Sequence, residues 1–149
     1  MTTTKKTTTK TTKTTKTVKA KSAVSSMKIA VADIDAIARA SAGVNALKAE
    51  QNAKTRELAL WLQNVQNELK KEQDKAKQAA LLQQYNAVFA QKRAGIIREY
   101  QAKLQIVSDA ISKTIADEAK KKGYDIVLAK NIVAFGGIDI TADIAKIVK

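Results

Sequence analysis

The sequence predicts a mainly helical protein in which a long antiparallel coiled-coil hairpin projects from a small β body. The chain has no proline among its 149 residues, and helix-forming residues continue almost without interruption over residues 45–122. Short apolar patterns typical of strands flank this run, in 28–33 and in 124–135. Such short strands are only marginally stable alone, so we expect both flanks, 28–44 and 123–149, to form one β body.

Residues 1–27 form a basic Thr/Lys tract that precedes the predicted body. The first 28 residues hold eight lysines and no acidic residue, whereas the remaining 121 hold 19 basic and 14 acidic residues. The tract has no apolar periodicity, so it is predicted to be disordered. Two roles stay open for it: binding of anionic lipid or nucleic acid through counterion release, or a solvated tail without a partner.

The first part of the body reads as a strand followed by a short helix. Asp35 is expected to cap this helix, which runs through Ala40, and Gly43 is expected to interrupt the chain. Asn45 is the expected N-cap of the long helical run. Gly123 suits the left-handed position just beyond the C-terminus of that run.

Apolar residues recur at steps of three and four within the long run, which indicates a coiled-coil seam. The seam is predicted from Leu58, Leu62, Val65 and Leu69 in the first half, and Ile97, Tyr100, Leu104, Val107, Ile111 and Ile115 in the second. One continuous helix would be roughly 117 Å long, whereas a hairpin would be half that length. The strands at both ends favour the hairpin, with its turn between 74 and 82.

The second part of the body is predicted as a strand over 124–129, a turn at 130–131 and a partner strand over 132–135. A terminal helix capped by Thr141 follows. A monomer cannot cover such apolar strands, so we expect a homo-oligomer. The expected body and subunit contacts are Ile29, Val31, Ile126, Val127, Leu128, Val133 and Phe135.

Composition argues against an enzyme, because the chain has no histidine and no cysteine. These two residue types supply the commonest general base, metal ligand and thiol nucleophile. We therefore expect no catalytic residue, metal or other cofactor. The sequence also contains no glycine-rich phosphate loop and no stretch of about 18 apolar residues that could span a bilayer.

Positive charge gathers in the distal parts of the two predicted helices. These residues, Lys70, Lys71, Lys75, Lys77, Lys92 and Arg93, are candidate contacts for acidic protein partners or lipid phosphates. An ordinary solvated face of a coiled coil explains them equally well. The aromatic residues of the run, such as Trp61 and Phe89, are expected to pack between the helices rather than on a partner.

Three segments of the chain resemble the Skp/OmpH chaperones. They are Lys28-Ile-Ala-Val-Ala-Asp33, Gly123-Tyr-Asp-Ile-Val-Leu128 and Asp139-Ile-Thr-Ala-Asp143 with the terminal Lys-Ile-Val-Lys149. Together with the coiled coil between them, they extend the resemblance over residues 28–149. The resemblance implies a trimer in which a central β barrel carries helical tentacles around a cavity for unfolded outer-membrane proteins. It also implies ATP-independent holding of these clients.

The resemblance implies residence in the periplasm, although no apolar signal segment precedes Met27. A cytoplasmic protein is expected if the Thr/Lys tract is the true N-terminus. The segment between Phe135 and Asp139 is also short for the family. Two other functions stay open: a coiled-coil scaffold or nucleic-acid-binding protein that uses the tract, and a chaperone similar to prefoldin, with helical hairpins on a hexameric body.

Overall fold

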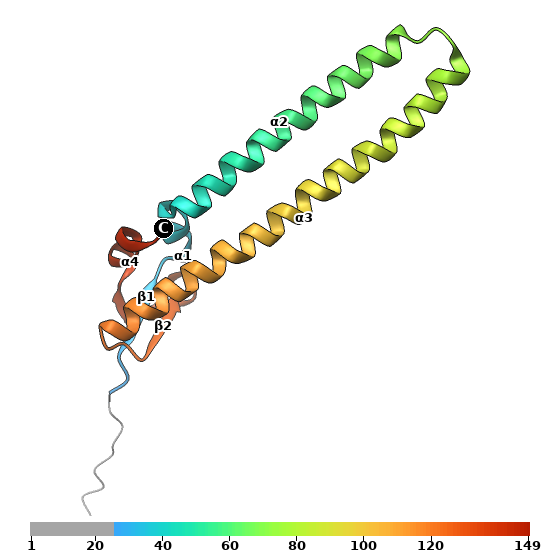
Figure 1. Cartoon of the computed structure of the whole chain (residues 1–149). Coiled ribbons are helices and arrows are strands. Elements are labelled where there is room, and N and C mark those ends of the chain that lie inside the picture. Colours follow the sequence, from blue (N-terminus) through green and yellow to red (C-terminus); the bar gives the residue numbers. More distant parts are fainter. Residues whose placement is uncertain (1–25) are drawn as a thin grey trace, which may run out of the picture.

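A computed structural model describes residues 26–149 and shows two long helices that extend from a small sheet (Figure 1). The elements are β1 (Ile29–Ala32), α1 (Ile34–Ala40), α2 (Ala42–Lys71), α3 (Lys75–Lys121), β2 (Ile126–Ala129), a 3-10 turn (Lys130–Ile132), β3 (Ile138–Asp139) and α4 (Thr141–Ile147). The predicted class, mainly helical with a small β body, is confirmed. Disorder was predicted for residues 1–27, and residues 1–25 of that range lie outside the described residues.

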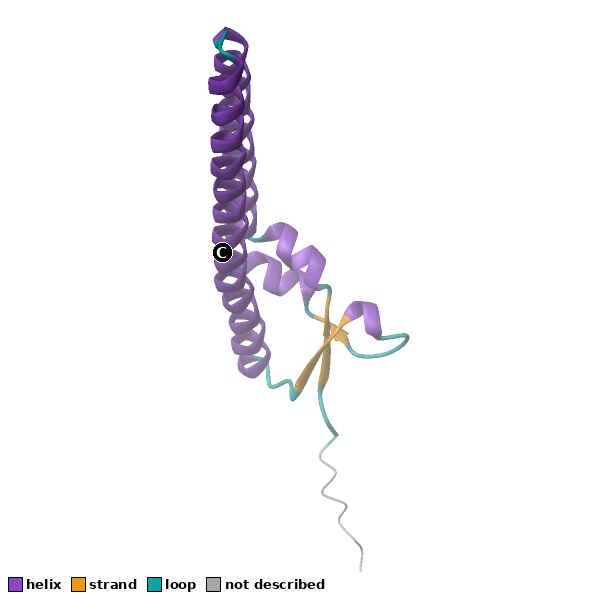
Figure 2. Cartoon of the chain, turned by 90° about the vertical axis from the view of Figure 1, so that its right-hand side faces the viewer, coloured by secondary structure: helices purple, strands orange, loops and turns teal. Residues whose placement is uncertain are grey.

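The sheet of the body has three parallel strands in the order β2-β1-β3. The strands are drawn in orange in Figure 2. Ile29 pairs with Ile126, and Val31 pairs with Leu128 on one side and with Asp139 on the other. Parallel neighbours need a long crossover connection, and the two long helices with α1 provide it between β1 and β2. Strands β1 and β2 are therefore neighbours in the sheet although the whole hairpin separates them in the sequence.

The predicted partner strand over 132–135 is wrong. Residues 130–132 form a 3-10 turn, and the chain then loops across the body to β3 on the far side of β1. Two glycines with positive φ, Gly136 at +90° and Gly137 at +86°, redirect the backbone at that point. Ile132 at the end of the 3-10 turn is 72% exposed, and Phe135 in the loop is 98% exposed. Neither residue pairs with a strand of the sheet.

One face of the sheet carries the core of the body. Ala30 and Ala32 of β1 are fully buried, and they lie in one cluster with Ile37 of α1 and Ile144 of α4. Small side chains on β1 let the two short helices approach the sheet closely. Ile111 of α3 belongs to the same cluster, so the base of the hairpin and the body share one core.

Two of the predicted helix caps lie one or two residues away from their actual positions. Asp33, not Asp35, caps α1, because its Oδ1 accepts a hydrogen bond from the backbone N–H of Ala36 at 2.9 Å. The N-cap position of α4 is Ile140, not Thr141. The hydroxyl of Thr141 accepts from the backbone N–H of Asp33 at 2.8 Å, so it joins the start of α1 to the start of α4.

The long helical run begins earlier than predicted, at Ala42, and includes Gly43. Its N-cap is the fully buried Ser41 rather than Asn45. The Ser41 hydroxyl accepts from the backbone N–H of Val44 at 3.3 Å and donates to the backbone oxygen of Lys149 at 2.7 Å. The same side chain therefore starts α2 and holds the last described residue against it.

Helices α2 and α3 lie side by side and run in opposite directions (Figure 1). Their contacts pair Glu50 with Lys103 near the body, and Leu69 with Gln78 near the tip. The turn covers only three residues, 72–74, and overlaps the predicted 74–82 range only at Asp74, because the rest of that range belongs to α3. Asp74 makes this short turn possible, because its Oδ1 accepts from the backbone N–H groups of the first turn of α3.

The far end of α3 matches the prediction. Gly123 has a φ of +77° and follows the C-cap Lys122. The N–H of Gly123 donates to the carbonyl of Lys120 at 3.1 Å, and that of Tyr124 donates to the carbonyl of Ala119 at 2.9 Å. This bonding satisfies the last carbonyls of the helix and turns the chain into β2.

Gly137→Ala is expected to destabilise the body by about 2 to 4 kcal/mol, because the new side chain adds backbone strain at positive φ and overlaps Val31. Gly136→Ala is the matched control, since its φ is also positive but no atom of the described residues lies within 4 Å of the added carbon. Urea denaturation followed by circular dichroism measures both. Equal losses in the two variants would contradict the close approach of Gly137 to β1.

Candidate functional site on the helical hairpin

The tip of the hairpin is closed by side chains that bond to the backbone. Gln78 Nε2 on α3 donates to the carbonyl of Leu69 on α2 at 2.8 Å, and a Glu72 carboxylate oxygen accepts from the backbone N–H of Asp74 at 3.0 Å. These bonds replace the apolar packing that the sequence lacks at this level. They fix the ends of both helices, and thereby the backbone positions of the lysines that flank the turn.

The structure divides the six predicted cationic residues into two groups. Lys70 and Lys71 end α2, and Lys75 and Lys77 begin α3, so these four lie around the tip. The other two, Lys92 and Arg93, follow Lys77 by about four helical turns, roughly 22 Å along α3. All six are exposed, and none has an ion-pair partner among residues 26–149. Their positive charge is therefore free to act on a partner.

Nearer the body, four charged residues that the sequence analysis did not single out join the two helices. Lys103 Nζ lies 2.5 Å from Glu50 and 3.0 Å from Glu99, and Lys54 pairs with the same two carboxylates. The hydrogen bond from Lys103 lowers the pKa of Glu50, and that from Lys54 lowers the pKa of Glu99. Both carboxylates thus stay ionised under mildly acidic conditions. Within each helix, the i,i+4 spacing of Glu50 with Lys54 and of Glu99 with Lys103 was visible in the sequence and could have indicated these charged residues.

Three aromatic side chains meet between the charged cluster and the tip. The Trp61 ring stacks on Phe89 with a centroid distance of 6.4 Å and meets the edge of Tyr85 at 6.2 Å. Tyr85 also donates its hydroxyl hydrogen bond to Glu68, which raises the pKa of the phenol. The expectation that the aromatic residues pack between the helices therefore describes this cluster correctly.

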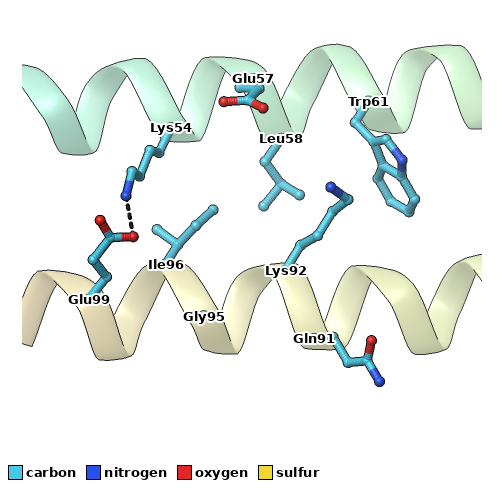
Figure 3. Close-up of a pocket in the computed structure, with 9 residues that line it drawn as sticks. All are labelled: Lys54, Glu57, Leu58, Trp61, Gln91, Lys92, Gly95, Ile96 and Glu99. Carbon is cyan, nitrogen blue, oxygen red and sulfur yellow. Dashed lines mark ion pairs between the residues drawn. The ribbon is translucent and has the colours of Figure 1, made fainter.

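A groove opens between the helices beside the aromatic cluster (Figure 3). It has a volume of about 320 Å³, and Leu58, Trp61, Lys92, Gly95 and Ile96 line it together with charged residues on its rims. In Figure 3 the Lys92 side chain extends from α3 toward α2, between Leu58 and Trp61. Its Nζ lies 5.6 Å from the centre of the Trp61 ring.

Most of the predicted seam residues are at least half-buried. Val65 and Ile111 are buried, and Leu58, Leu62, Leu69, Tyr100, Val107 and Ile115 are half-buried. Ile97 and Leu104 instead are 43% and 41% exposed. The residues that face α2 at those levels are Ile96, which lines the groove, and Lys103, which pairs with Glu50. The second half of the seam thus runs one residue earlier at both positions.

The seven predicted body contacts lie on different sides of the sheet. Val31 is buried, Val127, Leu128 and Val133 are half-buried, and Ile29, Ile126 and Phe135 are exposed. Val127 packs against the core of the body. Because neighbouring side chains alternate along a strand, its neighbour Ile126 lies on the opposite face with its partner Ile29. Val31, on this second face, lies against Gly137 and is buried, so within the described residues only the end of the face at Ile29 and Ile126 is uncovered.

Comparison with known families supplies the identity of this architecture. The family model described as outer membrane protein (OmpH-like) matches residues 21–148. The chain belongs to this OmpH-like family. The match confirms the resemblance that the strand and terminal-helix motifs indicated. A search of the curated proteins finds no match for the chain.

The OmpH-like match covers the whole hairpin and the body, so both belong to the family architecture. Within residues 26–149, no helix is both long enough and apolar enough to cross a membrane. The two long helices present charged and aromatic residues along a projecting hairpin (Figure 1). This hairpin is the candidate functional site of the OmpH-like chain.

Proposed function

We propose that this OmpH-like protein is an ATP-independent holdase chaperone that binds unfolded outer-membrane proteins between helical tentacles. The observation that carries the proposal is the set of six exposed basic residues on a hairpin that projects from the body, none of them ion-paired with another described residue. Such a surface attracts acidic segments through many weak contacts, which hold a client without fixing its conformation. Family membership supports the choice of client class.

The holding cavity requires several hairpins, and we propose a trimer assembled through the exposed end of the second face of the sheet, at Ile29 and Ile126. On and near that surface, Ile29 is 38%, Ile126 40% and Phe135 98% exposed. An exposed apolar surface of this kind is typical of a subunit interface. The three bodies would form the barrel, and the hairpins would surround the client. The periplasm is the proposed compartment, because folding outer-membrane proteins pass through it.

Replacing the six basic residues by glutamine is expected to weaken client capture several-fold at 10 mM salt and much less at 1 M. The electrostatic attraction is long-ranged at 10 mM salt, where the Debye length is about 30 Å. At 1 M salt the Debye length is only about 3 Å, so the attraction is largely screened. Binding of a urea-unfolded outer-membrane protein to the chaperone is measured by fluorescence anisotropy. The replaced side chains are exposed, so folding should be almost unaffected.

The control variant exchanges lysine and arginine at the same six positions and preserves the charge. It should bind like the unmodified protein at both salt concentrations. Equal binding by the glutamine variant at 10 mM salt would show that these residues are ordinary solvated side chains. Failure of the intact protein to hold any client, together with tight DNA binding, would favour the alternative of a nucleic-acid-binding scaffold that uses the Thr/Lys tract.

A further inference from the structure

Gly95 lies in the interior of the 47-residue helix α3, where glycine costs about 1 kcal/mol relative to alanine. The fold does not explain this residue. Its φ is not positive, and a carbon added at its Cβ position would meet no atom within 4 Å among the described residues, its own helical backbone aside. A larger side chain would therefore fit without strain. Gly95 lines the groove beside Trp61, and its missing side chain leaves that space open.

The lining of this groove combines apolar surface with one free charge on each rim. Leu58, Trp61 and Ile96 supply the apolar part. Lys92 on α3 and Glu57 on α2 also line the groove, and neither has an ion-pair partner among residues 26–149. The other two charges, Lys54 and Glu99, neutralise each other across the hairpin (Figure 3).

We propose that this groove is a client subsite that takes one aromatic side chain of an unfolded segment, with an acidic client residue beside it on Lys92. This inference rests on the proposed holdase function and names the client chemistry that the hairpin recognises. A volume of about 320 Å³ is at the lower end for ligand pockets and exceeds the roughly 150 Å³ of a cavity that holds a benzene ring, so an aromatic side chain fits. The flexible stem of Lys92 covers the bound ring while its ammonium group reaches the client carboxylate.

Glu57 makes the subsite directional. It repels a second acidic residue on the α2 rim, so acidic residues are accepted on the Lys92 side only. The subsite therefore selects aromatic residues with an acid on one side, and disfavours those with acids on both sides.

The fluorescence of Trp61 tests the subsite directly, because it is the single tryptophan of the chain. The probe is a twelve-residue Gly/Ser peptide that carries one phenylalanine followed by one aspartate, titrated into the full-length protein. We expect a saturable change in Trp61 emission. Gly95→Leu should fill the groove and weaken this binding about tenfold or more, while its melting temperature rises by several degrees because a glycine leaves a helix interior.

Ala94→Leu is the matched control, since Ala94 is exposed and does not line the groove. It should bind the peptide like the unmodified protein. Lys92→Gln should reduce the preference for the aspartate peptide over one with lysine in its place. A peptide with serine instead of phenylalanine should leave the emission unchanged.

The subsite would be overturned by unchanged peptide binding by Gly95→Leu, by an equal response to the serine peptide, or by a change in oligomer mass on Gly95→Leu. The third would show that a second copy of the chain occupies the groove. Suppression of client aggregation without any peptide response would overturn the subsite and leave the holdase function standing. Loss of both in the folded, unmodified protein would overturn the proposed function itself.

Discussion

The double variant Ile126→Asp with Phe135→Asp is expected to convert the oligomer into folded monomers. Both side chains are exposed in the single chain, at 40% and 98%, so their replacement removes no contact of the core. In the proposed trimer Phe135 buries almost its whole side chain, which contributes about 1.5 to 3 kcal/mol, and Ile126 buries its exposed 40%, which contributes about 1 kcal/mol. A loss of about 2.5 to 4 kcal/mol per subunit weakens association by roughly two to three orders of magnitude.

Light scattering coupled to size-exclusion chromatography measures the mass, and circular dichroism measures the helical content. The control variant Gln83→Glu with Gln101→Glu adds the same two negative charges at exposed positions of α3, and should keep the oligomer. Val127→Asp is a contrasting variant that should unfold the body, because Val127 packs against the core. A double variant that keeps the trimer mass would exclude this face of the sheet as the interface.

The contrast between Ile126 and Val127 shows what the sequence can and cannot predict in the body. An uninterrupted apolar run indicates a strand, but it does not tell which side chains face the core of the chain. That depends on the register with β1, where Ile29 pairs with Ile126 and Ala30 with Val127. Phe135 misled the prediction for a related reason, because an apolar residue in a loop resembles a strand residue when no partner is known.

The helical part was predictable in type and extent, since 78 residues without proline leave few alternatives. Its phase was not. Starting from Tyr100, steps of three and four residues reach either Ile97 or Ile96, and either Leu104 or Lys103. Apolarity favoured Leu104 over Lys103 and does not distinguish Ile97 from Ile96. The structure favours Lys103, through its ion pairs with Glu50 and Glu99, and Ile96, which lines the groove. A sequence pattern that scores only apolar residues cannot detect such a polar contact between helices.

Part of the candidate site was predictable in the same sense. The six basic residues were visible in the sequence and are exposed in the structure, but their division between the tip and Lys92–Arg93 depends on a turn of only three residues. The groove was not predictable, because Trp61 and Gly95 lie 34 positions apart and meet only when the two helices pair. Gly95 alone indicated merely a weak point in a helix.

Shortening the hairpin by two heptads on each helix is expected to abolish client holding while the body and tip remain intact. Removal of residues 55–68 and 85–98 places residue 69 after Lys54, and Glu99 after residue 84, so the ion pair between Lys54 and Glu99 is retained. Deletion of whole heptads preserves the phase of the seam. The deletion removes roughly 21 Å of each helix, including Trp61 and the groove, and leaves the four tip lysines in place.

The holding of a client is the central claim, and light scattering measures it most directly. A urea-unfolded outer-membrane protein is diluted into buffer without nucleotide, and its aggregation is followed with the intact protein, the shortened protein or neither. Circular dichroism and molecular mass first establish that the shortened protein is folded and keeps its oligomeric state. We predict that the intact protein suppresses the scattering and that the shortened protein leaves it as high as without chaperone. Equal suppression by both proteins would contradict the account, because the hairpin walls would then be unnecessary for holding.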